Sequence, residues 1–107
     1  MGKDETRRVV ALRGDIDFSS ATEIRALLLG GVESGRELCV DMSEVSYMDS
    51  AGIACLLEIQ YAASAKGVPF SLADVGDRVM RTLGLARLDR VFTILEPRPP
   101  GQKPDRN

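Results

Sequence analysis

The sequence has 107 residues, of which 44% are hydrophobic and 28% charged, a composition that fits one small globular domain and excludes a disordered or membrane-spanning chain. It contains no histidine, so catalytic sites of the Ser-His-Asp and Cys-His types and histidine-ligated zinc sites are excluded. The net charge of -2, with two tyrosines, three phenylalanines and no tryptophan to stack on bases, argues against direct binding of nucleic acid.

The first half of the chain begins with an apolar run that a helical pattern follows. The run at residues 9–12 is continuous and short, which predicts a buried strand. Ser19 or Ser20 is expected to cap the next helix, in which apolar residues recur at spacings of three and four. The glycine pair at 30–31 is expected to end that helix. This half therefore predicts a strand, a loop and a helix.

The same unit recurs along the rest of the chain. A second strand precedes a long helix that begins after Ser50 and that Gly67 ends, and a shorter helix is closed by Gly84. Such alternation predicts an α/β fold: one domain over residues 1–95, with a small, mostly parallel or mixed sheet and helices packed on it. The expected elements are a strand at 38–42, a helix at 51–66, a strand at 68–73, a helix at 75–83 and a strand at 91–95.

The two ends and the cysteines bear on where the protein works. Residues 96–107 hold four of the five prolines and little to bury, which predicts a disordered tail. The N-terminal residues lack the apolar core of a signal peptide, and no run approaches the roughly 20 apolar residues of a membrane span. Cys39 and Cys55 are too few for a four-cysteine zinc site or a disulfide framework. We therefore expect a cytoplasmic protein without membrane contact.

Ser50 is the most informative residue of the chain, because it stands between a strand and a helix and is followed by the small residues Ala51 and Gly52. One interpretation makes it the N-cap of the long helix, worth about 1 kcal/mol. The other makes it the acceptor of a phosphoryl group, because the free N–H groups and the dipole of a helix N-terminus tolerate an anion. Position alone leaves both open.

The long helix has two faces that differ in composition. At 100° per residue, one side is predicted to pack on the sheet. The opposite side is small and weakly apolar with a single acid, which indicates either a flat docking surface or an alanine-rich helix chosen for its propensity. The sheet side holds Ile53, Leu56, Leu57, Gln60 and Ala63, and the opposite side holds Ala51, Ala54, Cys55, Glu58 and Ala62.

Acidic residues follow the first two predicted strands. Asp15 and Asp17 come after the first and Asp49 after the second, and the carboxyl ends of parallel strands meet at one edge of a sheet. These acids are therefore expected near Ser50, where they serve either as caps of turns and helices or as acid, base or metal ligands. A modest basic patch comes later, at Arg78, Arg81, Arg87 and Arg90, and is expected to solvate the surface.

An enzymatic role for Ser50 would need a base. Without histidine, the available bases are Lys3, Lys66, Lys103 and the acids, so a Ser-Lys pair is the formal possibility. Lys66 lies at the far end of the same helix, about 24 Å away at 1.5 Å per residue. We therefore expect no enzymatic activity and no catalytic residue.

Two segments of the sequence resemble the STAS domain family, and specifically the bacterial anti-sigma factor antagonists. The segments are residues 14–17, Gly-Asp-Ile-Asp, and 40–52, which end in Asp-Ser-Ala-Gly; Leu83-Gly84-Leu85 also fits. The resemblance implies a partner switch in which the unphosphorylated antagonist binds an anti-sigma factor serine kinase and so frees a sigma factor. Phosphorylation releases the kinase, and a PP2C-like phosphatase resets the cycle.

The resemblance also implies roles for particular residues. Ser50 corresponds to the phosphorylated serine, and Asp17 to an acidic position of the binding surface. The chain would need no cofactor and no metal, since ATP and magnesium belong to the kinase. The partner-binding residues expected are Asp17, Asp49, Ala51, Gly52, Ala54, Cys55 and Glu58.

Two departures from the family pattern remain. Little room is left for the extra first strand of the antagonists, and a proline-rich tail stands where they end in a helix. The sheet edge at the first strand is therefore expected to be less covered, which favours self-association. The alternative function is that of a STAS subunit of a lipid or anion transport system, or of a stressosome-like scaffold, in which Ser50 is only a cap.

Overall fold

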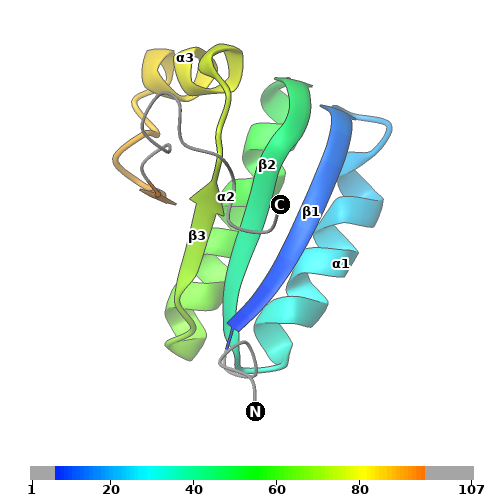
Figure 1. Cartoon of the computed structure of the whole chain (residues 1–107). Helices are drawn as coiled ribbons and strands as arrows, with labels where there is room; N and C mark the ends of the chain where they lie inside the picture. The colour runs from blue at the N-terminus through cyan, green and yellow to red at the C-terminus, as the bar shows by residue number, and fades with distance from the viewer. Residues whose placement is uncertain (1–6, 96–107) are drawn as a thin grey trace, which may run out of the picture.

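A computed structural model describes residues 7–95 of the chain. It contains a parallel four-stranded sheet in the order β1-β2-β3-β4, with helices in the connections, and so confirms the predicted α/β class (Figure 1). The expected tail at 96–107 lies outside the described residues. The elements are β1 (Arg7–Ile16), α1 (Ala21–Glu33), β2 (Glu37–Met48), α2 (Ser50–Lys66), β3 (Phe70–Ala73), α3 (Asp77–Leu85) and β4 (Thr93–Ile94).

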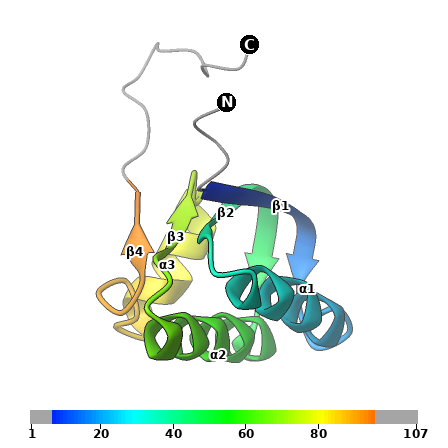
Figure 2. The ribbon, with the colours of Figure 1, turned by 90° about the horizontal axis from the view of Figure 1, so that it is seen from below.

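The molecule has two layers. Figure 2 shows α1 and α2 side by side on one face of the sheet, and none of the described helices covers the other face. The core fills the space between the sheet and these helices, with side chains such as Leu38, Val40 and Leu72 from the strands and Leu56 and Ile59 from α2 fully buried. Burial of one helical stripe against one sheet face is what stabilises a domain of this size.

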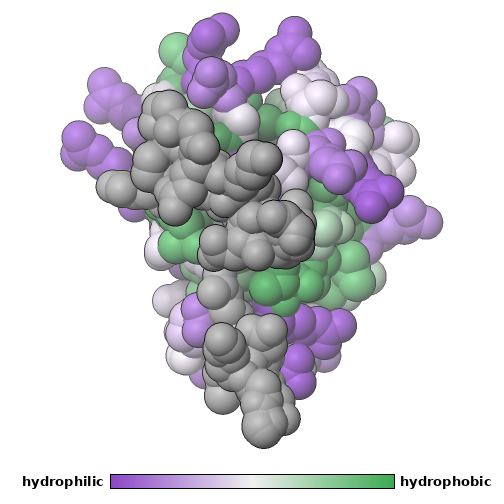
Figure 3. All heavy atoms as spheres, viewed as in Figure 1, coloured by the Kyte–Doolittle hydropathy of each residue, from purple (hydrophilic) through white to green (hydrophobic). Residues whose placement is uncertain are grey.

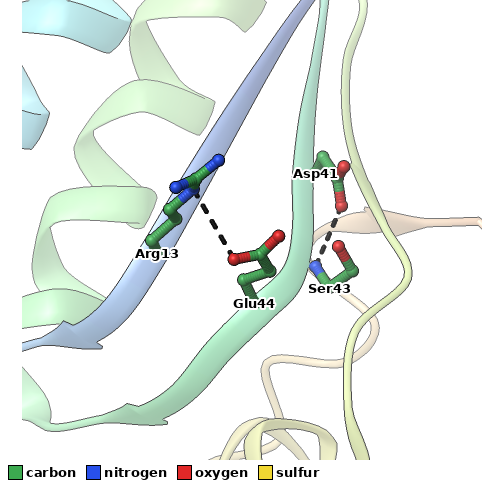
Figure 4. A network of polar contacts seen from close by, with 4 residues as sticks. All are labelled: Arg13, Asp41, Ser43 and Glu44. Atoms are coloured by element: carbon green, nitrogen blue, oxygen red, sulfur yellow. Dashed lines mark hydrogen bonds and ion pairs between the residues drawn. The ribbon is translucent and has the colours of Figure 1, made fainter.

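The pairing of β1 with β2 is interrupted at two places, and both irregularities add a residue to β2. Register passes from Ala11↔Asp41 to Arg13↔Glu44, and again shifts between Gly14 and Asp15. At the first irregularity, Arg13 Nε lies 3.5 Å from Glu44 Oε1 (Figure 4). On the same stretch of β2, Asp41 Oδ1 accepts a hydrogen bond of 2.9 Å from the backbone N–H of Ser43. Such bulges increase the local twist and re-aim the strand that carries them.

The first strand is not buried as predicted. It lies at the edge of the sheet, with the side chain of Val9 58% exposed and Ala11 also exposed, while Leu12 and Ile16 point into the core. The strand is therefore half-buried. A run of four apolar residues does not distinguish an edge strand from a central one, because β-branched residues suit both.

The predicted end of the first helix was wrong. The helix passes through both glycines to Glu33, and the turn after it uses Gly35 at φ +82°. Gly31 instead lies against the sheet, where a Cβ would come within 3.1 Å of Leu38 Cδ1. These glycines lie inside the helix, and one of them permits close packing.

The remaining elements follow the prediction with shifted ends. α2 begins one residue earlier than expected, at Ser50, and ends before Gly67, whose φ of +70° is the left-handed conformation of a helix C-terminus. α3 runs two residues further than expected, so Gly84 lies inside it. The helix closes with Arg87 at φ +62°, whose N–H donates to Gly84 O at 3.0 Å, while Leu88 N–H donates to Leu83 O at 2.8 Å.

Candidate functional site

The carboxyl ends of β1 and β2 meet at the start of α2, at the top of Figure 1. Ile16 and Met48 are paired in register, and Asp49 N–H donates a hydrogen bond of 3.2 Å to Ile16 O. Ser50 follows directly as the first residue of α2. The loop after β1 and the first turn of α2 are therefore neighbours.

Asp49, not Ser50, is the N-cap of α2. Its backbone is extended, and its Oδ1 accepts hydrogen bonds from Ala51 N at 2.9 Å and Gly52 N at 3.0 Å. The interpretation of Ser50 as the cap is therefore wrong. The carboxylate suits this position because it accepts from two N–H groups at once at the positive end of the helix dipole.

The hydroxyl of Ser50 is left available. Ser50 is exposed, and within residues 7–95 its side chain makes no hydrogen bond. Because the cap function is supplied by the preceding residue, this hydroxyl is not needed for the helix. It is an accessible oxygen at a helix N-terminus.

Gly52 holds α2 close to β1. A Cβ at this position would lie 2.5 Å from Ile16 O and 2.6 Å from Met48 Cγ, and Gly52 is buried. The expected partner contact at Gly52 is therefore corrected to a packing role. It fixes the distance between the start of α2 and the end of β1, and with it the position of Ser50.

The predicted outward face of α2 is wrong at Cys55. This residue is only 3% exposed, whereas Ala54 and Glu58 are exposed and Ala51 and Ala62 are partly buried. The helix is turned so that it also packs against α1, to which it is joined by an ion pair of 2.7 Å between Arg25 Nε and Glu58 Oε1. The side expected to face the sheet is turned away in part, since Ile53, Leu57 and Gln60 are only partly buried.

Burial also decides the chemistry of Cys55. Loss of solvent around the thiol raises its pKa, and the nearby Glu58 carboxylate raises it further. A raised thiol pKa lowers the fraction of the nucleophilic thiolate. Cys55 is therefore a packing residue of the α1–α2 interface and not a contact for a partner.

Asp17 organises the turn that leads into α1. Its Oδ1 accepts hydrogen bonds from Ser19 Oγ at 2.7 Å, Ser19 N at 3.0 Å and Ser20 N at 3.3 Å. The hydrogen bond from the Ser19 hydroxyl is the main cause that lowers the pKa of Asp17. Asp17 thus has the capping role that was one of its two interpretations.

Asp15 lies within β1 and not after it. It accepts a hydrogen bond of 3.1 Å from Ser46 Oγ of the neighbouring strand. The three acids at this edge are therefore each engaged by a local N–H or hydroxyl. Within residues 7–95 there is no group of three His, Cys, Asp or Glu side chains that could hold a metal ion.

Two exposed aromatic residues at this edge were missed by the sequence analysis. Phe18, between Asp17 and Ser19, is 85% exposed, and Tyr47, near the end of β2, is 43% exposed. A phenylalanine in a short polar turn between a strand and a helix is the signal that could have found the first, because such a turn has no core to enter.

The arginines of the basic patch are exposed, as expected. Two of them, Arg87 and Arg90, line an open hollow with Gly84 and Asp89 after α3. Among the described helices, none has the length and apolar character needed to cross a membrane.

Comparison with known proteins agrees with this geometry. A family model described as "Mlab, STAS domain" matches residues 1–96. The anti-sigma-B factor antagonist of Bacillus subtilis (strain 168) is 28% identical over 85 residues, which cover 79% of this chain and 78% of that protein.

Solved structures share the fold. A sulfate transporter family protein from Wolinella succinogenes has a TM-score of 0.72 at 20% identity, with 81% of this chain and 71% of that one covered. The phosphorylated form of the Bacillus cell fate determinant SpoIIAA has a TM-score of 0.66 at 17% identity, with 90% and 88% covered. The family match, which spans all the described residues, together with the parallel sheet and the Asp-Ser-Ala-Gly turn, shows that this chain belongs to the STAS domain family.

Proposed function

We propose that this chain is an anti-sigma factor antagonist that is switched by phosphorylation of Ser50. Unphosphorylated, it binds an anti-sigma factor serine kinase, and the sigma factor held by that kinase is released. The kinase transfers the γ-phosphoryl group of ATP to Ser50 and dissociates, and a PP2C-like phosphatase removes the phosphate. The protein acts as a cytoplasmic binding module and substrate, with no catalytic residue of its own.

The observation that carries this proposal is the unengaged hydroxyl of Ser50. Asp49 already satisfies the first N–H groups of α2, so a phosphate on Ser50 is not required to hold the helix and projects from the surface. The helix dipole favours the added anion, which keeps the fold intact. The effect of phosphorylation therefore falls on the partner.

The size of that effect follows from the charge. A phosphate adds about -1.5 to -2 charges at pH 7. At about 1 kcal/mol per charge pair at ~4 Å in water, a phosphate facing one carboxylate of the partner costs roughly 2 kcal/mol, which is near thirtyfold in affinity. One modified serine is thus enough to reverse binding.

The surface around Ser50 supports docking of a protein. Phe18 and Tyr47 offer exposed aromatic area at the same edge, and such residues commonly supply the largest share of binding energy. The outward side of α2 continues the surface with small side chains and one acid that is already paired with α1. The proposed contact residues are Asp17, Phe18, Tyr47, Asp49, Ala51, Ala54 and Glu58.

A binding measurement with the cognate kinase tests the proposal. We expect Ser50→Ala to bind like the wild type and to stay bound when ATP is added, whereas Ser50→Asp binds weakly. Ser19→Ala is the matched control, because Ser19 also lies close after an aspartate, in the turn before α1, and its hydroxyl donates a hydrogen bond to Asp17. Equal release of wild type and Ser50→Ala by ATP would contradict the switch.

A second candidate is a STAS subunit of a transport system or scaffold without phosphorylation. The likeness to a sulfate transporter family protein favours it. The same binding measurement separates the two, because such a subunit shows no affinity for an anti-sigma factor kinase with any residue at position 50.

A further inference from the structure

The segment after α3 folds back on the end of that helix and leaves an open hollow beside it. Gly84, Arg87, Asp89 and Arg90 line this hollow, which has a volume of about 310 Å³. Pockets that bind small molecules begin at about this size. None of the four residues belongs to the docking surface proposed around Ser50. The hollow is therefore formed by a different set of side chains from the proposed switch.

Two consecutive turns shape the hollow. In the first turn, Arg87 N–H donates to Gly84 O at 3.0 Å. Leu88 N–H donates to Leu83 O at 2.8 Å, which completes the Schellman motif of a helix C-terminus. The next turn contains the other two lining residues and is closed by a hydrogen bond of 3.0 Å from Val91 N–H to Leu88 O. The backbone around the hollow is therefore fixed by its own hydrogen bonds.

Two of the lining residues are unfavourable for the backbone positions that they occupy. Gly84 lies inside α3, where alanine would be more stable, and a Cβ there would meet nothing within 4 Å. Arg87 has φ +62° just after the helix, at a position where the left-handed conformation favours glycine. Departures of this kind, which cost stability, concentrate at functional sites.

Both departures contribute to the hollow. Gly84 leaves its wall without a side chain, and Arg87 adds a guanidinium group. Arg87 and Arg90 are exposed, and neither forms an ion pair within residues 7–95, where the paired arginines are Arg13 and Arg25. The hollow therefore has two guanidinium groups that no carboxylate of the described chain neutralises.

The end of α3 is basic in a chain that is acidic as a whole. Residues 77–91 hold four arginines and two aspartates, which gives this segment a net charge of +2, whereas the chain has -2. Figure 3 shows hydrophilic side chains projecting at the upper left, where α3 and the segment after it lie. Such a local field attracts anions. Compensation of the helix dipole explains a cation after α3, but it does not require one at the left-handed position.

The lining side chains indicate the chemistry of a ligand. Guanidinium groups present a planar fork of N–H donors that matches the oxygens of a phosphate group. Asp89 adds an acceptor, which favours a hydroxyl donor and disfavours a second anionic group nearby. At about 30 Å³ per water molecule, the volume corresponds to roughly ten waters, which is more than a phosphate ion needs.

We propose that this hollow binds a small phosphorylated alcohol or sugar. Arg87 and Arg90 hold the phosphate group, and Asp89 accepts a hydrogen bond from a hydroxyl of the same molecule. Gly84 leaves room for the carbon chain between them. The domain thus has a small-molecule site in addition to the surface proposed for its protein partner, and the site does not depend on Ser50.

Titration of the isotope-labelled full chain with glycerol 3-phosphate, followed by NMR, tests the proposal. We expect saturable shifts of the backbone amides that line the hollow, with a dissociation constant of about 1 mM or below. Arg87→Gly and Arg90→Gln should each weaken binding roughly tenfold or more. Arg78→Gln is the matched control, because it removes an exposed charge from α3 without changing the hollow, and it should retain the affinity.

A comparison of ligands tests the contact with Asp89. Asp89→Asn should reduce the preference for glycerol 3-phosphate over inorganic phosphate, and an unchanged preference would contradict the hydroxyl contact. Vesicles that contain phosphatidylglycerol test whether the phosphate belongs to a lipid. Binding to these vesicles without binding to the soluble ester would overturn the proposal.

Urea denaturation separates a binding role from a structural one. Gly84→Ala is expected to raise the folding equilibrium constant roughly two- to fivefold, and Arg87→Gly should not lower it, because each change suits the backbone better. Both should weaken the binding of the ester. Lower stability of both variants would mean that the fold requires these residues and would overturn the proposal. So would a lack of saturation at tens of millimolar ester, or equal losses of affinity in Arg78→Gln and Arg87→Gly.

Discussion

The chain contains two turns in which an aspartate is followed closely by a serine, one before α1 and one before α2, and the serine hydroxyl is hydrogen-bonded only in the first. Before α1, Asp17 Oδ1 accepts hydrogen bonds from both the backbone and the hydroxyl of Ser19. Before α2, Asp49 Oδ1 accepts only from the backbone of Ala51 and Gly52, and the hydroxyl of Ser50 makes no bond within the described chain. Both turns lie at the carboxyl edge of the sheet.

The difference comes from the spacing between the aspartate and its helix. Asp49 directly precedes α2, so its carboxylate caps the helix and Ser50 falls in the first turn with its side chain outward. Asp17 stands four residues before Ala21, so its carboxylate closes the intervening turn through the serines. A serine is thus available for modification where the residue before it does the capping.

The largest expected effect is on the free energy of unfolding, and it tests whether Gly52 holds the turn before α2 against β1. Gly52→Ala should destabilise the fold by about 1–3 kcal/mol, because its Cβ would meet the backbone oxygen of Ile16 at 2.5 Å. Gly30→Ala, in α1 with open space around it, is the control and should stabilise by about 0.5–1 kcal/mol. Urea denaturation measures both, and equal stability of the two variants would contradict the packing role.

Loss of the exposed aromatic ring of the first turn should weaken partner binding. Phe18→Ala is expected to raise the dissociation constant for the kinase by roughly five- to thirtyfold, which corresponds to about 1–2 kcal/mol for the loss of a large exposed aromatic contact. Its urea midpoint should stay unchanged, because the ring is 85% exposed. Calorimetric titration with the kinase measures the affinity, and an unaltered value would remove Phe18 from the docking surface.

Loss of the cap of α2 should have a smaller effect on stability. Asp49→Ala is expected to cost about 1 kcal/mol, since two N–H groups lose their acceptor, whereas Asp49→Asn retains most of the cap. Thermal unfolding compares the two. If Asp49→Ala were as stable as the wild type, a different group would cap α2, and the availability of Ser50 would need another explanation.

The smallest expected effect concerns the first turn and appears only in acid. The lowered pKa of Asp17 means that its ionised form is favoured by folding, chiefly through Ser19. This stabilisation is present above the ordinary pKa of 3.8 and is lost as the pH falls through the folded-state value. Asp17→Asn should therefore be less pH-dependent than the wild type below about pH 4. Parallel acid titrations of unfolding that coincide would contradict this assignment.

The sequence was sufficient for the fold and for the exposed serine. Alternating strands and helices predicted the parallel sheet, and Ser50 and Gly67 marked both ends of α2, because capping chemistry is local. It was insufficient for the cap itself, since Asp49 and Ser50 are both good capping residues and only the backbone conformation distinguishes them.

The residues whose environment was predicted wrongly are those whose burial depends on contacts between elements far apart in the sequence. Cys55 is buried because α1 packs beside α2, and no periodicity within α2 reveals a neighbour on its flank. The glycines at 30–31 were expected to end the helix by their low propensity, but both lie within it, and Gly31 permits close packing against Leu38. The edge position of β1 depends on strand order, which a local apolar run does not contain.

Transfer of phosphate from ATP by the cognate anti-sigma factor kinase tests the central claim most directly. Intact mass after incubation should show one added phosphoryl group on the wild type and on Ser19→Ala, and none on Ser50→Ala. Full modification of Ser50→Ala, or modification of the wild type that Ser19→Ala abolishes, would contradict the account.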